Sequence, residues 1–145
     1  MICFSSAAAA AILFSTDVSV HSMTPLERAI HQVETSGAIT GDTPILGDWC
    51  PRRKIHLSRG PLQISRAAWS DCLERDPTIG GRYEDVDGLG YSLRIFRTYQ
   101  SRYATPVRVG TVTDEIKARI WNGGPNGHKK AATVSYWEKT KRWLP

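Results

Sequence analysis

Cysteine is scarce in this chain, with only three residues, Cys3, Cys50 and Cys72, among 145. Small domains held together by disulfides usually carry about four to eight cysteines, which excludes a disulfide scaffold here. At most one bridge is expected, and it would join Cys50 to Cys72 in an oxidising compartment, because Cys3 lies in a segment that can be removed. The fold must therefore be stabilised by the packing of its core.

The sequence also lacks a metal-binding pattern. Its cysteine spacings match no zinc site, and its four histidines are scattered singly along the chain. Isolated histidines are more often surface or structural residues than metal ligands, so we expect neither a metal ion nor a cofactor. These histidines are His21, His31, His56 and His128.

No transmembrane segment is expected. The apolar, alanine-rich run from Ile2 to Phe14 is too short to cross a bilayer as a helix and has the length of a signal-peptide core. It lacks the positively charged residues that normally precede such a core. Residues 1–22 are therefore either a signal peptide, which makes the protein secreted or periplasmic, or an extension upstream of a true start at Met23.

Acidic residues are outnumbered, with 19 Lys and Arg against 14 Asp and Glu and a net charge of +5. A basic surface attracts polyanions, which include nucleic acid and anionic cell wall. A charge run of this kind is usually a solvated helix face, and attraction to wall polymers explains it, so we expect no nucleic-acid partner. The cluster consists of Lys129, Lys130, Lys139, Lys141 and Arg142.

Alternating strand patterns are nearly absent, the longest running from Arg108 to Val112, and a mainly α class follows. The first helix begins at Thr24 with a capping box and a proline at its first position, and it ends at Ser36-Gly37. Residues 38–60 contain turn residues without a helical period and predict a long loop between the first two helices. Further helices are expected at about 66–74, 84–103, 113–122 and 133–143, giving a single domain of about five helices over residues 23–145.

Glu34 falls in the last turn of the first helix, where unpaired carbonyl groups disfavour an ionised carboxylate. A glutamate that keeps its proton near about pH 6 can protonate a glycosidic oxygen as it leaves. A glutamate at such a position is, however, more often an ordinary surface residue. The position therefore permits an acid without assigning one.

Two further segments could contact a polar ligand. Gly60-Pro61-Leu62-Gln63-Ile64 presents an amide that can donate to and accept from sugar groups, and its ordinary interpretation is a loop entering a helix. Trp121-Asn122-Gly123-Gly124-Pro125 combines a flat aromatic face, an amide and glycines, and its ordinary interpretation is a helix stop. Their joint occurrence behind Glu34-Thr35-Ser36-Gly37 is much less expected by chance.

Together these segments resemble the invertebrate-type lysozyme (destabilase) family. The order and spacing agree from about residue 26 to 142, and the resemblance implies a lysozyme-like fold with Glu34 as the catalytic acid. Lytic transglycosylases and goose-type lysozymes share part of the pattern, but the Asn-Gly-Gly-Pro block favours the invertebrate-type branch. The matching segments are Val33 to Gly37, Gly60 to Ile64 with Trp69, Ala118 to Gly127, and Tyr136-Trp137.

The resemblance also marks departures from the family pattern. The low cysteine content is more like that of bacterial relatives than of animal members. The family's second carboxylate lies in the loop before Gly60, which is longer here because residues 50–58 look inserted; Asp48 is the best match and Asp42 the reserve. In members with isopeptidase activity a histidine precedes Asn-Gly-Gly-Pro, and Trp121 in its place argues against that activity.

The expected function is therefore a lysozyme that cleaves the β-1,4 glycan backbone of bacterial peptidoglycan as a monomer. Three alternatives stay open: a lytic transglycosylase that uses Glu34 alone, an inactive glycan-binding module, and a chitin-like substrate. The candidate catalytic residues are Glu34 and Asp48, and the candidate substrate contacts are Gln63, Ser36, Tyr91, Trp121, Asn122, Gly123 and Gly124.

Overall fold

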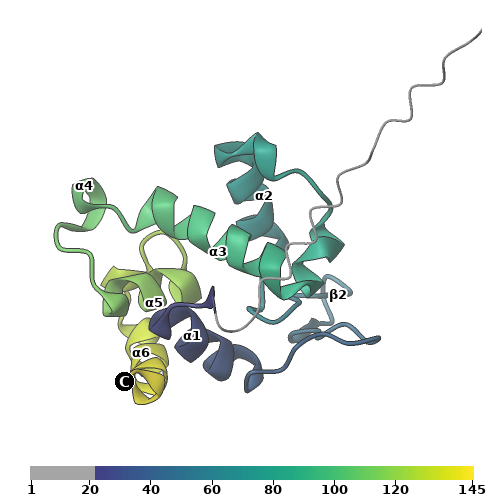
Figure 1. The fold of residues 1–145 in the computed structure, drawn as a ribbon, viewed down its shortest axis with the longest axis horizontal. Coiled ribbons are helices and arrows are strands. Elements are labelled where there is room, and N and C mark those ends of the chain that lie inside the picture. The colour runs from purple at the N-terminus through teal and green to yellow at the C-terminus, as the bar shows by residue number, and fades with distance from the viewer. Residues whose placement is uncertain (1–21) are drawn as a thin grey trace, which may run out of the picture.

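A computed structural model describes residues 22–145, and the expectations for residues 1–21 lie outside these residues. Six α-helices and one short hairpin occur in the described part, and short 3-10 segments connect several of them (Figure 1). The prediction of a mainly α class is confirmed. The elements are α1 (Pro25–Thr35), β1 (Trp49–Cys50), β2 (Ile55–His56), α2 (Arg66–Arg75), α3 (Leu89–Tyr103), α4 (Pro106–Val109), α5 (Asp114–Gly123) and α6 (Val134–Thr140).

The first helix begins as the sequence predicts. The Thr24 hydroxyl accepts from the Glu27 amide (3.2 Å), and the Glu27 carboxylate accepts from the Thr24 amide (2.8 Å), which completes the capping box. At the other end Ser36 adopts a left-handed conformation (φ 55°) and its amide donates to the Gln32 carbonyl. These two ends fix the length of α1, and with it the position of Glu34 in its last turn.

Helix α3 is the longest helix among the described residues, and it packs against both α2 and α5. It begins at Leu89 rather than near Glu84, because Gly88 has an extended backbone (ψ 129°) that separates α3 from a preceding 3-10 segment, Tyr83–Asp87. The interior is built mainly from aliphatic side chains with less than 2% of their surface exposed. The largest of them are Ile30, Leu62, Ile64, Leu93, Ile95 and Ile120.

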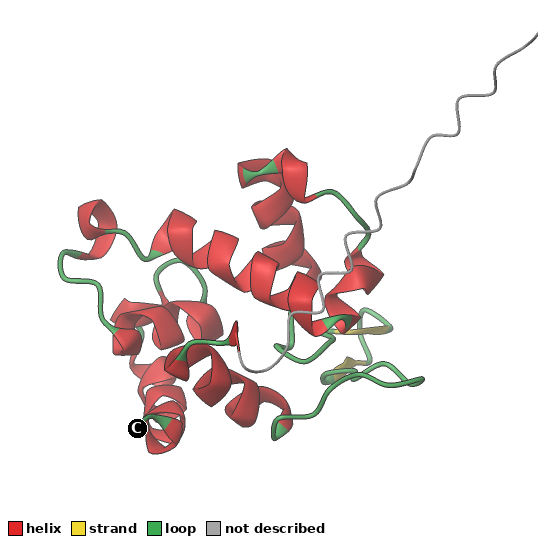
Figure 2. Cartoon of the chain, in the orientation of Figure 1, coloured by secondary structure: helices red, strands yellow, loops and turns green. Residues whose placement is uncertain are grey.

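The long loop of residues 38–60 contains a hairpin that the sequence did not predict. Trp49 pairs with His56 and Cys50 with Ile55 in antiparallel register, and Leu46 bridges to Arg59 below them. The expected alternation from Arg108 to Val112 is not a strand, because Pro106 starts the short helix α4 there. Figure 2 shows the small share of strand in the molecule.

Cys50 and Cys72, the pair expected to form a bridge in an oxidising compartment, are both free thiols in this structure. Cys72 points from α2 into the core, where its thiol donates to the Ile95 carbonyl (3.4 Å), whereas Cys50 lies half-buried on the hairpin. Burial raises the pKa of the Cys72 thiol to about 12. The core of this domain therefore holds a protonated thiol in place of a disulfide.

The helices form two groups that place a site between them. Helices α1, α5 and α6 pack on one another, α2 packs on α3, and α3 also contacts α5. The last predicted helix, 133–143, is α6 with the 3-10 segments Ala131–Thr133 and Lys141–Trp143 at its ends. Among residues 22–145 no helix has the length and apolar character needed to span a bilayer.

Candidate active site

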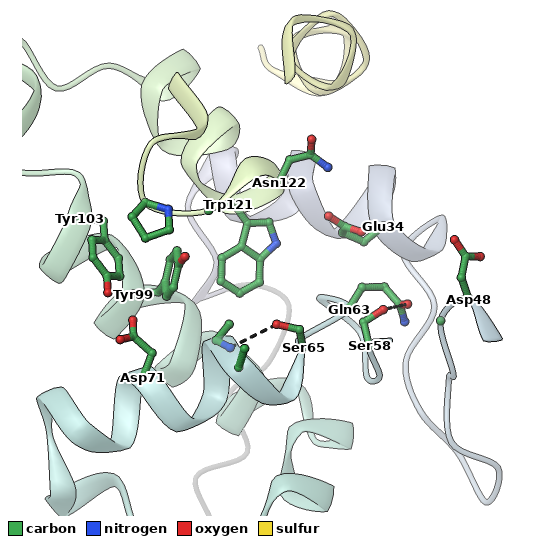
Figure 3. A pocket seen from close by; sticks show the side chains of 15 residues that line it. Glu34, Asp48, Ser58, Gln63, Ser65, Asp71, Tyr99, Tyr103, Trp121 and Asn122 are labelled. Atoms are coloured by element: carbon green, nitrogen blue, oxygen red, sulfur yellow. Dashed lines mark hydrogen bonds between the residues drawn. The ribbon is translucent and has the colours of Figure 1, made fainter. Parts of the chain in front are cut away.

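A groove of about 780 Å³ runs between the end of α1, the base of the hairpin, the start of α2 and the end of α5 (Figure 3). Its walls combine carboxyl, amide, hydroxyl and aromatic side chains, which suit a polar ligand with many hydroxyl groups. The lining residues are Glu34, Gly47, Asp48, Ser58, Gln63, Ser65, Ala67, Ala68, Asp71, Tyr99, Tyr103, Trp121, Asn122, Gly124 and Pro125.

Glu34 lies in this groove with one hydrogen-bond partner from a distant part of the chain. The Tyr136 hydroxyl of α6 donates to Glu34 Oε1 at 2.6 Å, and no ion pair involves this carboxyl among the described residues. Burial raises the pKa of Glu34 from 4.5 to about 7, and the hydrogen bond from Tyr136 opposes the rise. Glu34 therefore keeps its proton to a much higher pH than an ordinary glutamate does.

Tyr136 is itself buried in the core, with 8% of its surface exposed. Burial, the nearby charge of Glu34 and the hydrogen bond between them all raise the pKa of Tyr136 well above its ordinary value. The phenol therefore stays protonated and can only donate to the ionised carboxylate. This contact fixes the orientation of the Glu34 carboxyl group.

Gln63 is held beside Glu34 by the turn that enters α2. Its backbone is in the left-handed region (φ 50°), which is uncommon for a residue other than glycine. The Ser58 hydroxyl donates to Gln63 Oε1 (2.8 Å), and Gln63 Nε2 donates to the Gly60 carbonyl (3.0 Å). These bonds fix the amide and leave one N–H and part of the oxygen's accepting capacity for a ligand.

Asp48 is exposed at the rim of the groove, in the segment directly before β1. The hairpin fixes its backbone, because the Leu57 amide donates to the Asp48 carbonyl and the Gly47 amide donates to the Ser58 carbonyl, both at 2.9 Å. A Cβ atom on Gly47 would lie 2.1 Å from Ser58 Oγ, so only glycine allows this close approach. Asp42, the reserve candidate, does not line the groove.

The end of α5 forms the opposite wall. The Trp121 ring makes edge contacts with Phe96 and Tyr99, at centroid distances of 4.9 and 5.7 Å, so its position is fixed by the core. Asn122 and Gly124 also line the groove, and Gly124 has a positive φ of 83°. The helix therefore stops where an amide and an open stretch of backbone face the groove.

Three predicted contacts lie outside the groove lining: Ser36, Gly123 and Tyr91. Ser36 caps α1, and a Cβ on Gly123 would meet Thr133 rather than a ligand. The Tyr91 hydroxyl accepts from Trp69 Nε1 (2.9 Å) and donates to the Gly80 carbonyl (2.7 Å), so its polar atom is engaged in structural bonds.

Sequence reasoning missed the far end of the groove. There Asp71 of α2 forms an ion pair with Arg102 (3.1 Å), and Tyr99 and Tyr103 of α3 stand beside it (Figure 3). The helical period indicates that the tyrosines face inward, but it does not show that a groove meets them. Asp71 carries no local signal that separates it from a surface acid. Within residues 22–145 no group of His, Cys, Asp and Glu is arranged to hold a metal ion.

Fold and site together define a class: a mainly helical domain with a protonatable glutamate in an amide- and aromatic-lined groove, as in enzymes that cleave glycans by general acid catalysis. No family model matches the chain. Curated relatives do match. This chain is 33% identical to the lysozyme of Ostrea edulis over 86 residues, a stretch that covers 59% of each of the two chains. Invertebrate-type lysozyme 6 of Caenorhabditis elegans is 34% identical over 91 residues, 59% of this chain and 66% of that one.

The lysozyme of Meretrix lusoria is 33% identical over 91 residues, which cover 59% of this chain and 67% of that one. The chain belongs to the invertebrate-type lysozyme family. The match spans about three fifths to two thirds of the length of these relatives.

Solved structures agree with the family in fold. The crystal structure of Tapes japonica lysozyme superimposes with a TM-score of 0.65 at 27% identity and covers 83% of this chain and 89% of that one. A chain of the structure of Aeromonas hydrophila PliI in complex with Meretrix lusoria lysozyme matches with a TM-score of 0.59 at 24% identity, covering 83% and 88%, which bears on the fold alone. The prediction of a lysozyme-like fold is confirmed.

Proposed function

We propose that this chain is a lysozyme that hydrolyses the β-1,4 glycan backbone of bacterial peptidoglycan, with Glu34 as its general acid and residues 23–145 as its catalytic domain. One observation carries the proposal: Glu34 lies in the groove with a pKa of about 7. A carboxyl group with this pKa is protonated often enough to donate near neutral pH and is acidic enough to give up its proton. The curated relatives named lysozyme support the same reaction.

In this mechanism Glu34 transfers its proton to the glycosidic oxygen while the bond from that oxygen to the anomeric carbon breaks. Asp48 is the proposed second carboxylate, and it either bonds to the anomeric carbon or directs the water. In the first case water breaks the bond between Asp48 and the anomeric carbon and gives one proton back to Glu34; in the second case water bonds to the anomeric carbon directly and gives one proton to Asp48. A carboxyl separation of about 5 Å favours the first role, and roughly 6.5 to 9.5 Å favours the second.

Gln63, Trp121 and Asn122 are the proposed sugar contacts. The Gln63 amide and the Asn122 amide can exchange hydrogen bonds with hydroxyl and acetamido groups, while the rigid indole of Trp121 offers an apolar face for a sugar ring. The unused N–H of Gln63 is oriented in advance by Ser58, which lowers the entropic cost of binding.

A lytic transglycosylase is the second candidate, and the exposure of Asp48 favours it. A solvated carboxylate at the rim of the groove stabilises a positive centre less than an enclosed one does. In a transglycosylase Glu34 acts first as acid and then as base, and the product ends in an anhydro sugar instead of a hydrated reducing end.

The decisive experiment is mass analysis of the products released from purified peptidoglycan. Hydrated reducing ends support hydrolysis, anhydro ends support transglycosylation, and no product supports an inactive glycan-binding module. Purified chitin oligosaccharides, run in parallel, separate the two substrate classes.

Glu34→Gln tests the role of the acid directly, with Glu138→Gln as a matched control. Glu138 lies on α6 close to Tyr136 in sequence, but its carboxylate is exposed and pairs with Lys141 on the surface. We expect Glu34→Gln to lower turnover at least about 100-fold and Glu138→Gln to change it little. Equal turnover of Glu34→Gln and the unmodified enzyme would refute the mechanism.

This function requires access to the bacterial wall, so we also propose that residues 1–22 act as an export signal. Sequencing the N-terminus of the mature protein tests this, because a signal peptide predicts a start close to Met23 after export. Retention of residues 1–22 on exported protein would contradict it.

A further inference from the structure

The hairpin segment of residues 46–57, called here the basic hairpin, presents large apolar side chains to solvent. Leu46, Trp49, Ile55 and Leu57 are 46%, 52%, 40% and 44% exposed. Four large apolar residues are this exposed within twelve positions, and the register places Trp49 and Ile55 on opposite faces of the hairpin, because Trp49 shares a face with His56. Exposed apolar surface of this extent marks interaction sites on proteins. The four residues border a depression of about 430 Å³ whose lining also includes Arg53 and Lys54.

The tip of the same hairpin is strongly cationic. Arg52, Arg53 and Lys54 are consecutive and exposed, and none of the three has an ion-pair partner among residues 22–145. Glu84 and Asp87, on the packed side, already pair with Arg59 and with Arg66 of α2. Asp48, the acid of the hairpin itself, forms no ion pair with the tip. The positive charge of the tip is therefore uncompensated.

The two features are held in fixed register. Trp49 pairs with His56 across the strands, and their rings meet edge to face at a centroid distance of 5.0 Å. The His56 ring also donates from Nδ1 to the Gly47 carbonyl at 2.7 Å. In Figure 2 the loop that carries this hairpin extends beyond the helices, so a flat surface could reach it.

We propose that the basic hairpin binds the surface of an anionic phospholipid bilayer. The exposed indole suits the interface, where an amphipathic ring prefers to sit, and the exposed aliphatic side chains of the same hairpin suit the boundary of the acyl region. The three cations suit the lipid phosphates. A glycan is a poorer occupant, because three of the four exposed apolar side chains are aliphatic and no amide side chain of residues 22–145 lines the depression, whereas Gln63 and Asn122 line the groove around Glu34.

Binding to vesicles tests the proposal with the full-length chain. Vesicles of phosphatidylcholine mixed with phosphatidylglycerol are compared with vesicles of phosphatidylcholine alone, and bound protein is measured by sedimentation. The test variant combines Arg52→Gln, Arg53→Gln and Lys54→Gln. Its matched control combines Arg75→Gln, Lys129→Gln and Lys139→Gln, three exposed cations on separate elements, and therefore has the same net charge.

We expect the hairpin variant to bind anionic vesicles at least about tenfold more weakly, since each cation near such a surface contributes roughly fivefold. The control variant should lose much less. Equal losses in the two variants would overturn the proposal, because they would show attraction by net charge alone. Any contribution from the apolar run at residues 2–14 is common to all variants and cancels.

Trp49→Ser isolates the apolar part, with Trp143→Ser as its control. Trp143 is 57% exposed and lies in Lys141–Trp143 beside the C-terminus, which Figure 1 shows at the other end of the molecule from β2. We expect only Trp49→Ser to weaken vesicle binding, with circular dichroism confirming that both variants fold. Binding to a phosphate-rich wall polymer but not to vesicles, or dimerisation through the hairpin, would overturn the bilayer as the occupant.

Discussion

Tyr136→Phe should move the pH dependence of catalysis in one direction. The substitution removes the hydroxyl that donates to Glu34 at 2.6 Å and leaves the buried ring in place. That hydrogen bond lowers the pKa of Glu34 against the rise caused by burial. Without it, ionisation of Glu34 becomes less favourable and its pKa must rise above about 7.

The size of the change follows from the difference between charged and neutral hydrogen bonds. A bond to an ionised group contributes about 1.5 to 3 kcal/mol and a neutral one about 1 kcal/mol, so ionised Glu34 loses roughly 1 to 2 kcal/mol more than protonated Glu34. At about 1.4 kcal/mol for each tenfold change in proton binding, the pKa rises by about one. Since the acid must be protonated to act, the alkaline limb of the kcat profile should move from about pH 7 to about pH 8.

The assay is kcat against pH on a soluble oligosaccharide substrate, with Tyr91→Phe as the control. The Tyr91 hydroxyl is engaged as well, in two hydrogen bonds, but Tyr91 lies outside the groove, so loss of its hydroxyl should leave the alkaline limb in place. An alkaline limb that stays at the same pH in Tyr136→Phe, or moves toward acid, would refute the reasoning. Loss of kcat at all pH values without movement of the limb would show that Tyr136 only orients the carboxyl.

Three further predictions concern the carboxylates and the hairpin. Asp48→Asn should lower hydrolysis at least about tenfold while Asp42→Asn has little effect, and undiminished hydrolysis by Asp48→Asn would refute the two-carboxylate mechanism. Glu34→Gln should raise the free energy of unfolding by up to about 3 kcal/mol at pH 8 and by much less at pH 4.5, measured by denaturant titration, because the ionised carboxylate is unfavourable where it is buried. Gly47→Ala should destabilise the protein by roughly 1 to 3 kcal/mol, because its Cβ would meet Ser58 and Gln63, whereas Gly41→Ala meets nothing within 4 Å and should cost little.

Local signals made part of this molecule predictable. The cap at Thr24 and the stop at Ser36 lie within one helix, so α1 and the position of Glu34 follow from neighbouring residues. The sequence attributed the retained proton of Glu34 to its place at a helix end. That reason was incomplete, because burial is the main cause of the raised pKa. That burial depends on α6 and on Tyr136, which lies 102 residues away in the chain and has no local connection to Glu34.

Other features could not be predicted because tertiary contacts decide them. Tyr91 has the side chain of a sugar contact, but Trp69 and the Gly80 carbonyl engage its hydroxyl, and nothing in the local sequence shows this. The hairpin of residues 46–57 has strands of only two residues, too short for an alternating pattern to be visible. Asp71 reaches the groove only because α2 packs on α3.

Helix α1 carries two carboxylates with opposite pKa shifts, and the difference explains how one short helix supplies both stability and chemistry. At Glu27 burial would raise the pKa, but hydrogen bonds from Arg97 (2.7 Å) and from Thr24 outweigh it, and the pKa lies below its ordinary value. At Glu34 no cation compensates for burial, and the pKa rises to about 7. The first site is at the positive end of the helix and the second at the negative end, so the helix dipole acts in the same sense as these environments.

The two shifts have opposite consequences for stability. Ionised Glu27 stabilises the folded state. This stabilisation is fully present above the pKa of Glu27 in the unfolded chain, about 4.5, and is lost as the pH falls through the lower pKa that Glu27 has in the folded protein. Glu34 favours the folded state while it is protonated, and this contribution is lost as the pH rises from 4.5 to about 7. Considering these two groups alone, the fold is most stable near pH 4.5. Glu34 begins to release its proton readily only near pH 7.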